Sequence, residues 1–305
     1  MVTVLRGEGA GQRWELAARA PHPALRGHVR RLIGFTEAGA EPVRRLEMPS
    51  STVTLIVGFA GEGWDVSLPW DPSAERTRHT AFVAGLHGTA AVTEQRGFVG
   101  GVQADLTPAG AHQLLAVSMA ELAGRVAPLE DGLGTDPGTR DLQERLACAS
   151  GWDDRLDLVE HWLAARLDGA APAAPEVAWA CARLQRTGGT LPVGALTEEL
   201  GWSRRHLAAR FRAQVGVTPK ALARLLRFER AVSLLAGARA GDVELGRVAL
   251  DCGYYDQAHF NRDFRAFAGV TPTAYLARRA DPGAGISAEA VQQVTSVQDP
   301  GRAAA

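Results

Sequence analysis

Side chains able to form paired hydrogen bonds gather on the outward faces of two short helices predicted near the C-terminus. Arginine carries a rigid fork of donors that matches phosphate oxygens and the edge of guanine, and Gln or Asn can pair with adenine. These residue types favour contact with a nucleic acid. The first helix presents Arg204, Arg205, Ala208, Ala209 and Arg212, and the second presents Gln257, Ala258, Asn261, Arg262 and Arg265.

One pattern of residues positions both helices, first in 201–219 and again in 253–272. Each copy follows an apolar helix and has a glycine turn, a short polar-to-basic helix and a Gly-x-Thr-Pro exit. The glycine permits a tight turn, and Ser203 and Asp256 are expected to cap the next helix by accepting a bond from free backbone N–H groups. The repeat predicts two helix-turn-helix units.

Apolar residues at helical spacing predict which face of each helix is buried, because positions three or four apart share a face. His206, His259, Trp202 and Tyr254 are interpreted as packing groups rather than ligands. The expected core positions are Val193, Leu196, Leu200, Leu207 and Phe211 in the first copy and Leu245, Val248, Cys252, Phe260 and Phe264 in the second.

Residues 176–279 resemble the C-terminal DNA-binding domain of AraC/XylS-type transcription regulators. The resemblance is carried by the second copy and its exit, and the segment 219–235 is similar to the family's connecting helix. It implies that the two recognition helices enter successive major-groove segments of one duplex. The matching positions are Ala249, Gly253, Tyr254, Asp256, Gln257, His259, Phe260, Arg262, Phe264, Arg265, Gly269, Val270, Thr271, Pro272 and Tyr275.

The same resemblance implies a role for each outward residue. Arg205 would pair with guanine, Gln257 or Asn261 with adenine, and the alanines would offer only methyl contacts, for example to thymine. Arg204, Arg212 and Arg265 are assigned to phosphates, which position a protein without reading sequence. Base-edge contacts are expected at Arg205, Ala208 and Ala209 in the first helix and at Gln257, Ala258, Asn261 and Arg262 in the second.

The net charge of −1 over 305 residues averages two regions of opposite sign. Residues 176–280 hold 16 Lys and Arg against 9 Asp and Glu, whereas residues 1–175 hold 16 against 22. A basic segment joined to an acidic one fits a nucleic-acid module attached to a domain that should not adhere to DNA.

The sequence predicts an α+β protein, in which a β-rich domain (small barrel or sheet plus covering helices) precedes an all-α double helix-turn-helix domain. Residues 1–28 show no clear period. Thr107 is expected to cap a helix that begins at Pro108. The predicted strands are Val29–Phe35, Thr52–Phe59, Trp64–Leu68, Thr80–Leu86 and Gly97–Leu106, and two further helices are predicted at Gly138–Ala149 and Asp153–Leu167.

The expected domains are an N-terminal effector-binding or dimerisation domain at 1–168, a linker at 169–175, the DNA-binding domain at 176–279 and a disordered tail at 280–305. The stretch 100–111 resembles N-terminal domains found on some actinobacterial regulators of the family, which implies no ligand.

Residue patterns for chemistry are sparse in the N-terminal region. The histidines lack metal-ligand spacing, Ser50 and Ser51 lack a neighbouring triad, and the Gly58–Gly63 segment is interpreted as a hairpin connection. Phe59, Trp64, Trp70 and Phe82 are assigned to core packing in preference to a pocket. We therefore expect no enzyme activity, no metal and no cofactor.

Three functions remain open at this point. The first is a sequence-specific transcription regulator in the cytoplasm, with DNA, a small effector, RNA polymerase and a second copy of the chain as partners, and with no membrane contact. The second is a DNA-repair alkyl-transfer protein with the same reader, which Cys148, Cys181 and Cys252 disfavour because their spacing suits no metal. The third is an architectural DNA-binding module without an effector.

Overall fold

The computed structural model describes residues 2–9, 11–69, 76–115, 117–132, 138–168, 170–237 and 243–279. In this part of the chain, nine strands form one antiparallel sheet with the order β1-β2-β3-β8-β4-β7-β9, and β5 pairs with β6 and β8. The strands are β1 Thr3–Gly9, β2 Gln12–Arg19, β3 Val29–Glu47, β4 Val53–Ala60, β5 Trp64–Ser67, β6 Thr77–His79, β7 Ala81–Ala84, β8 Ala91–Leu106 and β9 Val126–Pro128.

The long strands β3 and β8 form the centre of the sheet, and glycines let large rings pack against their backbone. Gly101 of β8 pairs with Phe35 of β3 and with Gly58 of β4. A Cβ on Gly101 would stand 3.2 Å from the rings of both Phe35 and Trp64, so only glycine leaves room for them without a shift. Trp64 and Phe82 are buried on this face, as the core-packing interpretation expects.

The structure shows strands where the sequence has no clear period, and it contradicts one sequence-based interpretation of the N-terminal region. Residues 1–28 contain the β1–β2 hairpin, which turns at Gly11 (φ 73°). The Gly58–Gly63 segment is not a hairpin connection, because β4 pairs with β7 and β8 whereas β5 pairs with β6 and β8. Both strands therefore pair with different stretches of the long strand β8 rather than with each other. Trp70, the fourth aromatic residue of that interpretation, lies outside the described residues.

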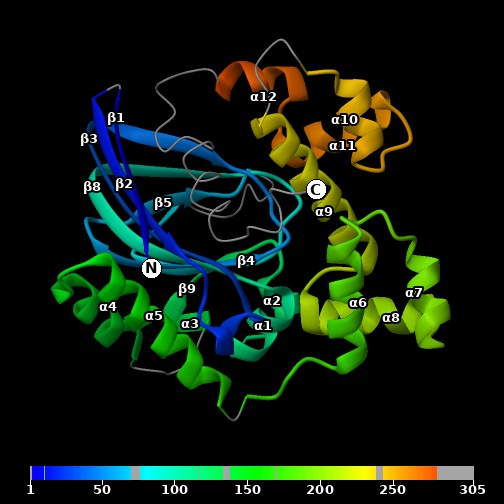
Figure 1. Ribbon diagram of the computed structural model, residues 1–305, viewed down its shortest axis with the longest axis horizontal. Coiled ribbons are helices and arrows are strands. Elements are labelled where there is room, and N and C mark those ends of the chain that lie inside the picture. Colours follow the sequence, from blue (N-terminus) through cyan, green and yellow to red (C-terminus); the bar gives the residue numbers. More distant parts are fainter. Residues whose placement is uncertain are drawn as a thin grey trace.

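Helices follow the sheet and cover one of its faces (Figure 1). Thr107 caps the first of them, with its hydroxyl accepting from Gly110 N at 3.0 Å, and Pro108 occupies the first helical position, as predicted. The ring of Trp152 packs directly on Gly34 of β3, which places α5 against the sheet. These helices are α1 Pro108–Leu114, α2 Met119–Leu122, α3 Leu129–Gly132, α4 Gly138–Cys148 and α5 Trp152–Leu167; the short 3-10 helix η1 Pro23–Leu25 precedes β3.

The C-terminal part of the described chain is all-α, which completes the predicted α+β architecture. Its helices lie beside the sheet domain, with α9 running between the two helix-turn-helix units (Figure 1). They are α6 Pro175–Arg186, α7 Val193–Leu200, α8 Arg204–Val215, α9 Pro219–Gly237, α10 Leu245–Asp251, α11 Gln257–Ala268 and α12 Pro272–Arg279.

The proposed division of the chain at 169–175 falls between α5 and α6, and the boundaries stay a prediction. In that segment Ala173 is buried and Ala174 N donates to Gln214 Oε1 of α8 at 3.0 Å. The predicted tail at 280–305 and Gly169 lie outside the described residues. One apolar cluster contains buried residues of both the sheet domain and helices α6–α11, so the two parts of the chain share a continuous core.

Candidate nucleic-acid interface

The first helix-turn-helix unit is formed by α7 and α8. Helix α7 ends at Gly201, whose φ of 66° lies in the left-handed region that glycine adopts without steric cost. Ser203 then caps α8, and its hydroxyl accepts from His206 N at 3.2 Å. The turn and the cap are both as predicted, and together they fix the direction in which α8 leaves α7.

The second unit, formed by α10 and α11, repeats this construction. Gly253 has a φ of 77°, and the Asp256 carboxylate accepts from His259 N at 2.6 Å at the start of α11. The predicted packing of the aromatic residues is confirmed, because the Tyr254 ring lies 5.3 Å from both the His259 and Phe260 rings. In the first unit the Trp202 and His206 rings lie 4.5 Å apart in the matching place.

The repeated Gly-x-Thr-Pro exit stops one helix and starts the next. Gly216 and Gly269 end α8 and α11 in the left-handed region, with φ of 86° and 71°. Thr218 Oγ1 then accepts from Ala221 N, and Thr271 Oγ1 accepts from Ala274 N, each at 3.2 Å. The exit thus fixes the direction of α9 and α12 relative to the recognition helices.

Buried anchors hold one face of each recognition helix against the core. Leu207 and Phe211 of α8, and Phe260 and Phe264 of α11, have no exposed surface. In α11 the anchors belong to an aromatic cluster in which Phe264 lies 5.2 Å from Phe228. The opposite faces of α8 and α11 are consequently directed to solvent.

The structure leaves most of the predicted DNA-contacting residues accessible. The five arginines of the predicted DNA-contacting set on α8 and α11 are exposed. None of them forms an ion pair with another residue in the described part of the chain. Free guanidinium groups of this kind are available to phosphates and base edges. The exposed members of the set are Arg204, Arg205, Ala209, Arg212, Gln257, Ala258, Arg262 and Arg265, and Ala208 and Asn261 are half-buried.

Asn261 differs from the other polar members of the set in the orientation of its amide. Its Oδ1 is buried and has no hydrogen-bond partner among the described residues. Pairing with adenine requires both the amide donor and the amide acceptor at the base edge. In this orientation Asn261 cannot present both, whereas Gln257 is exposed at the first position of α11.

One exposed residue beside the interface escaped the sequence interpretation. Tyr255 is 88% exposed and lies in the turn immediately before the capping Asp256. A phenol at this place could donate to a phosphate next to the N-terminus of α11. Its position directly before a predicted cap is the signal that could have identified it.

Two of the three cysteines are poorly suited to nucleophilic chemistry. Burial raises the pKa of Cys181 to about 12 and that of Cys252 to about 11, so neither thiol ionises readily at neutral pH. Cys148 is exposed. No group of three His, Cys, Asp or Glu residues that could hold a metal ion occurs in the part of the chain that the structure describes.

The fold and the two capped units define a helix-turn-helix protein with an N-terminal β-sheet domain. Residues 196–278 match the family described as "Helix-turn-helix domain", and this match spans both units. Residues 196–278 therefore form a helix-turn-helix domain, which agrees with the resemblance to the DNA-binding domain of AraC/XylS-type regulators. Among curated proteins no relative of the chain was found.

Several solved structures are similar to parts or most of the chain. The C-terminal domain of AraT, a response regulator from Geobacillus stearothermophilus, is 24% identical over 35% of this chain and 87% of its own, with a TM-score of 0.32. Apo ToxT K231A from Vibrio cholerae is 11% identical over 89% of this chain and 98% of its own, with a TM-score of 0.43. The DNA-binding domain of AdpA, solved with a target DNA, is 26% identical over 34% of this chain and 93% of its own, with a TM-score of 0.31.

No helix in the described residues is long and apolar enough to span a membrane.

Proposed function

We propose that this protein is a sequence-specific transcription regulator that reads two successive major-groove segments of one DNA duplex. The proposal rests chiefly on one observation: two helix-turn-helix units, built with the same caps and turns, each leave a basic or polar helix face open to solvent. The family match supports DNA binding by this part of the chain. The positive balance of residues 176–280 would attract the duplex without regard to sequence.

The outward residues divide into two roles. Arg205 would read guanine, Gln257 adenine, and Arg262 a further base edge, while Asn261 would contribute through its amide only after rotating. Ala208, Ala209 and Ala258 would make methyl contacts. Arg204, Arg212 and Arg265 would hold phosphates, which orient the protein without selecting a sequence.

The N-terminal sheet domain would control this reading through a small effector or through dimerisation, and RNA polymerase would be the partner at the promoter. The AdpA structure contains a target DNA, and one ToxT structure contains an unsaturated fatty acid. Each is a partner of the named protein; for this chain, an operator duplex and a small effector are proposed. A thermal-shift screen with small metabolites tests for an effector, because a metabolite that binds the folded chain should raise its Tm.

A binding selection from random duplexes tests the proposed function. The full chain should enrich two short boxes whose centres lie about one helical turn apart, roughly 34 Å, on one face of the duplex. Enrichment of a single box would contradict reading by both helices. Equal retention of all sequences would contradict sequence-specific regulation and favour the architectural alternative.

A further inference from the structure

The sheet domain touches the DNA-binding domain on three different helices. The first contact is at the end of α8, where Gly216 lies so close to α2 that a Cβ would stand 2.5 Å from the Met119 carbonyl oxygen and 3.2 Å from Ala123 Cβ. Helices α1 and α2 of the sheet domain pack along this helix. The C-terminal end of the first recognition helix is therefore seated on the sheet domain.

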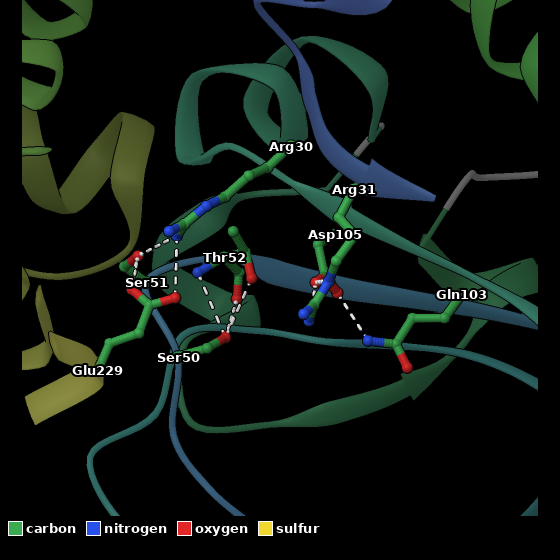
Figure 2. Close-up of polar contacts among 8 residues, drawn as sticks. All are labelled: Arg30, Arg31, Ser50, Ser51, Thr52, Gln103, Asp105 and Glu229. Carbon is green, nitrogen blue, oxygen red and sulfur yellow. Dashed lines mark hydrogen bonds and ion pairs between the residues drawn. The ribbon is translucent and has the colours of Figure 1, made fainter. Parts of the chain in front are cut away.

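The second contact is a polar cluster on α9, the helix that joins the two units (Figure 2). Glu229 Oε1 accepts from Arg30 Nη1 at 2.9 Å, and Glu229 Oε2 accepts from Ser51 Oγ at 2.6 Å. Arg30 Nη1 also donates to Ser51 Oγ at 3.1 Å. Ser51 is fully buried, whereas the Arg30 and Glu229 side chains are 34% and 27% exposed. Each of the three residues thus contacts the other two.

The third contact is at the end of α11. Ala90, just before β8, donates its backbone N–H to the Phe267 carbonyl oxygen of α11 at 2.7 Å. Phe267 itself is buried in the apolar cluster that continues into the sheet domain. The second recognition helix is thereby tied to the same rigid sheet as the first.

These three contacts bear on the spacing of the two recognition helices. Inserting one base pair between two boxes moves them apart by roughly 3.4 Å and rotates one relative to the other by about 35°. A protein follows such a change only if its two reading helices can move relative to each other. Contacts at Gly216, Glu229 and Phe267 with one sheet domain oppose that motion, in addition to the restraint from α9.

We propose that the sheet domain is a brace that fixes the separation of α8 and α11, and so sets which spacing of the two DNA boxes is accepted. The Arg30, Ser51 and Glu229 cluster orients the brace on α9. Most of the holding comes from apolar packing at the shared core, because a partly exposed ion pair contributes little by itself. This inference rests on the proposed function, since it concerns the DNA that the two helices would read.

Reversing the charge at Glu229 tests the brace, because an arginine there would repel Arg30 across the domain interface. The matched control is Glu199→Arg. Glu199 of α7 accepts from Arg183 of α6 at 2.9 Å in a pair of similar exposure that lies wholly inside the C-terminal helical region. Both variants change the net charge equally, so the contribution of total charge to the attraction to DNA is matched between them. Glu229→Gln serves as a milder second variant.

Affinity is measured for duplexes that carry the selected boxes at the preferred spacing and with one base pair added or removed. The wild type and Glu199→Arg should bind the altered spacings much more weakly than the preferred one. In Glu229→Arg the ratio of the two affinities, preferred to altered spacing, should be several-fold smaller, and the base preference inside each box should be unchanged. Restoring the charge pair in the double variant Arg30→Glu, Glu229→Arg should restore the rejection. A spacing profile that is the same in wild type, Glu229→Arg and Glu229→Gln overturns the proposal.

A distance measurement without DNA separates the failure of the brace from the failure of the proposed function. Spin labels at Ala213→Cys and Ala266→Cys, both exposed on α8 and α11, report the separation in a Cys148→Ser background. Cys181 and Cys252 are buried and should stay unlabelled. The distance distribution should broaden in Glu229→Arg but not in Glu199→Arg. Equal widths refute the brace even if the protein reads DNA, and absence of two-box DNA refutes the proposed function alone.

Discussion

The two helix-turn-helix units share one plan but are supported from different sides. Helix α11 is held mainly within its own domain, where Asp263 accepts from Arg224 Nη2 of α9 at 2.8 Å and Phe264 contacts the rings of Phe228 and Tyr275. Helix α8 depends more on the sheet domain, because α1 and α2 pack along it. Any change in the sheet domain is therefore expected to reach the first recognition helix more strongly than the second.

The two recognition helices also differ in how many polar side chains they present to the bases. On α8, Arg205 is the one predicted base reader with hydrogen-bonding capacity, since Ala208 and Ala209 offer only methyl groups. On α11, Gln257 and Arg262 are both exposed and polar. Recognition of the first box should thus depend on Arg205 alone, whereas recognition of the second box is shared between Gln257 and Arg262.

The largest effect is expected from Arg205→Ala. Loss of a bidentate contact to guanine should lower discrimination at one position of the first box by about 1–3 kcal/mol, or roughly 5- to 150-fold. Competition binding with single-base operator variants measures it. The control is Arg212→Ala, which should weaken specific and random DNA alike and reduce the slope of log affinity against log salt by about 1. If both variants act equally on specific and random DNA, the division between readers and phosphate contacts is wrong.

A smaller effect separates the two amides of α11. Gln257→Ala should remove about 1–2 kcal/mol of discrimination for adenine at one position of the second box, less than Arg205→Ala, because a neutral amide forms weaker hydrogen bonds than a guanidinium. Asn261→Ala should cost less than half as much, because its Oδ1 is buried in the orientation that the structure shows. The same competition assay compares the two variants. A larger loss for Asn261→Ala would show that this amide rotates on binding and is the main reader.

The repeated units could be predicted from sequence because their signals are local. Turn glycines, the caps Ser203 and Asp256, and the threonines of the exits act on backbone groups within three residues of themselves. Such features depend little on the rest of the fold. They are also the features that the structure confirms at Gly201 and Gly253.

The sheet domain resisted prediction because its determinants lie far apart in the chain. Strands β1 and β2 contain Gly, Arg and Glu at many positions, and their order comes from pairing with β3 rather than from an apolar run. The contact between Ser51 and Glu229 joins residues 178 positions apart. Nothing near Ser51 in the sequence indicates that partner, so neither the interface nor its effect on helix spacing could be predicted.

Removal of the two caps should produce effects on stability that again differ between the units. An N-cap substitution to alanine typically costs about 1 kcal/mol. The bond at Asp256 is shorter than that at Ser203, 2.6 Å against 3.2 Å, and a carboxylate also interacts with the positive end of the helix dipole. Asp256→Ala should therefore lower the free energy of unfolding more than Ser203→Ala in urea titrations. Equal or reversed losses would contradict the proposed difference in cap strength.

The smallest effect concerns His112, which lies on α1 against the first unit. Its pKa is lowered, first by burial and second by the positive charge of Arg210 on α8. Because the unfolded chain binds the proton more readily, the contribution of neutral His112 to stability is complete above pH 6.5, the ordinary value, and is lost as the pH falls toward the folded pKa. The Tm of the wild type should fall between pH 7.5 and 5.5, and His112→Gln should show a smaller fall. Burial also lowers the pKa values of His79 and His87, so part of the pH dependence of Tm should remain in His112→Gln. An equal fall in both proteins would mean that protonation of His112 does not weaken the seat of α8 on the sheet domain.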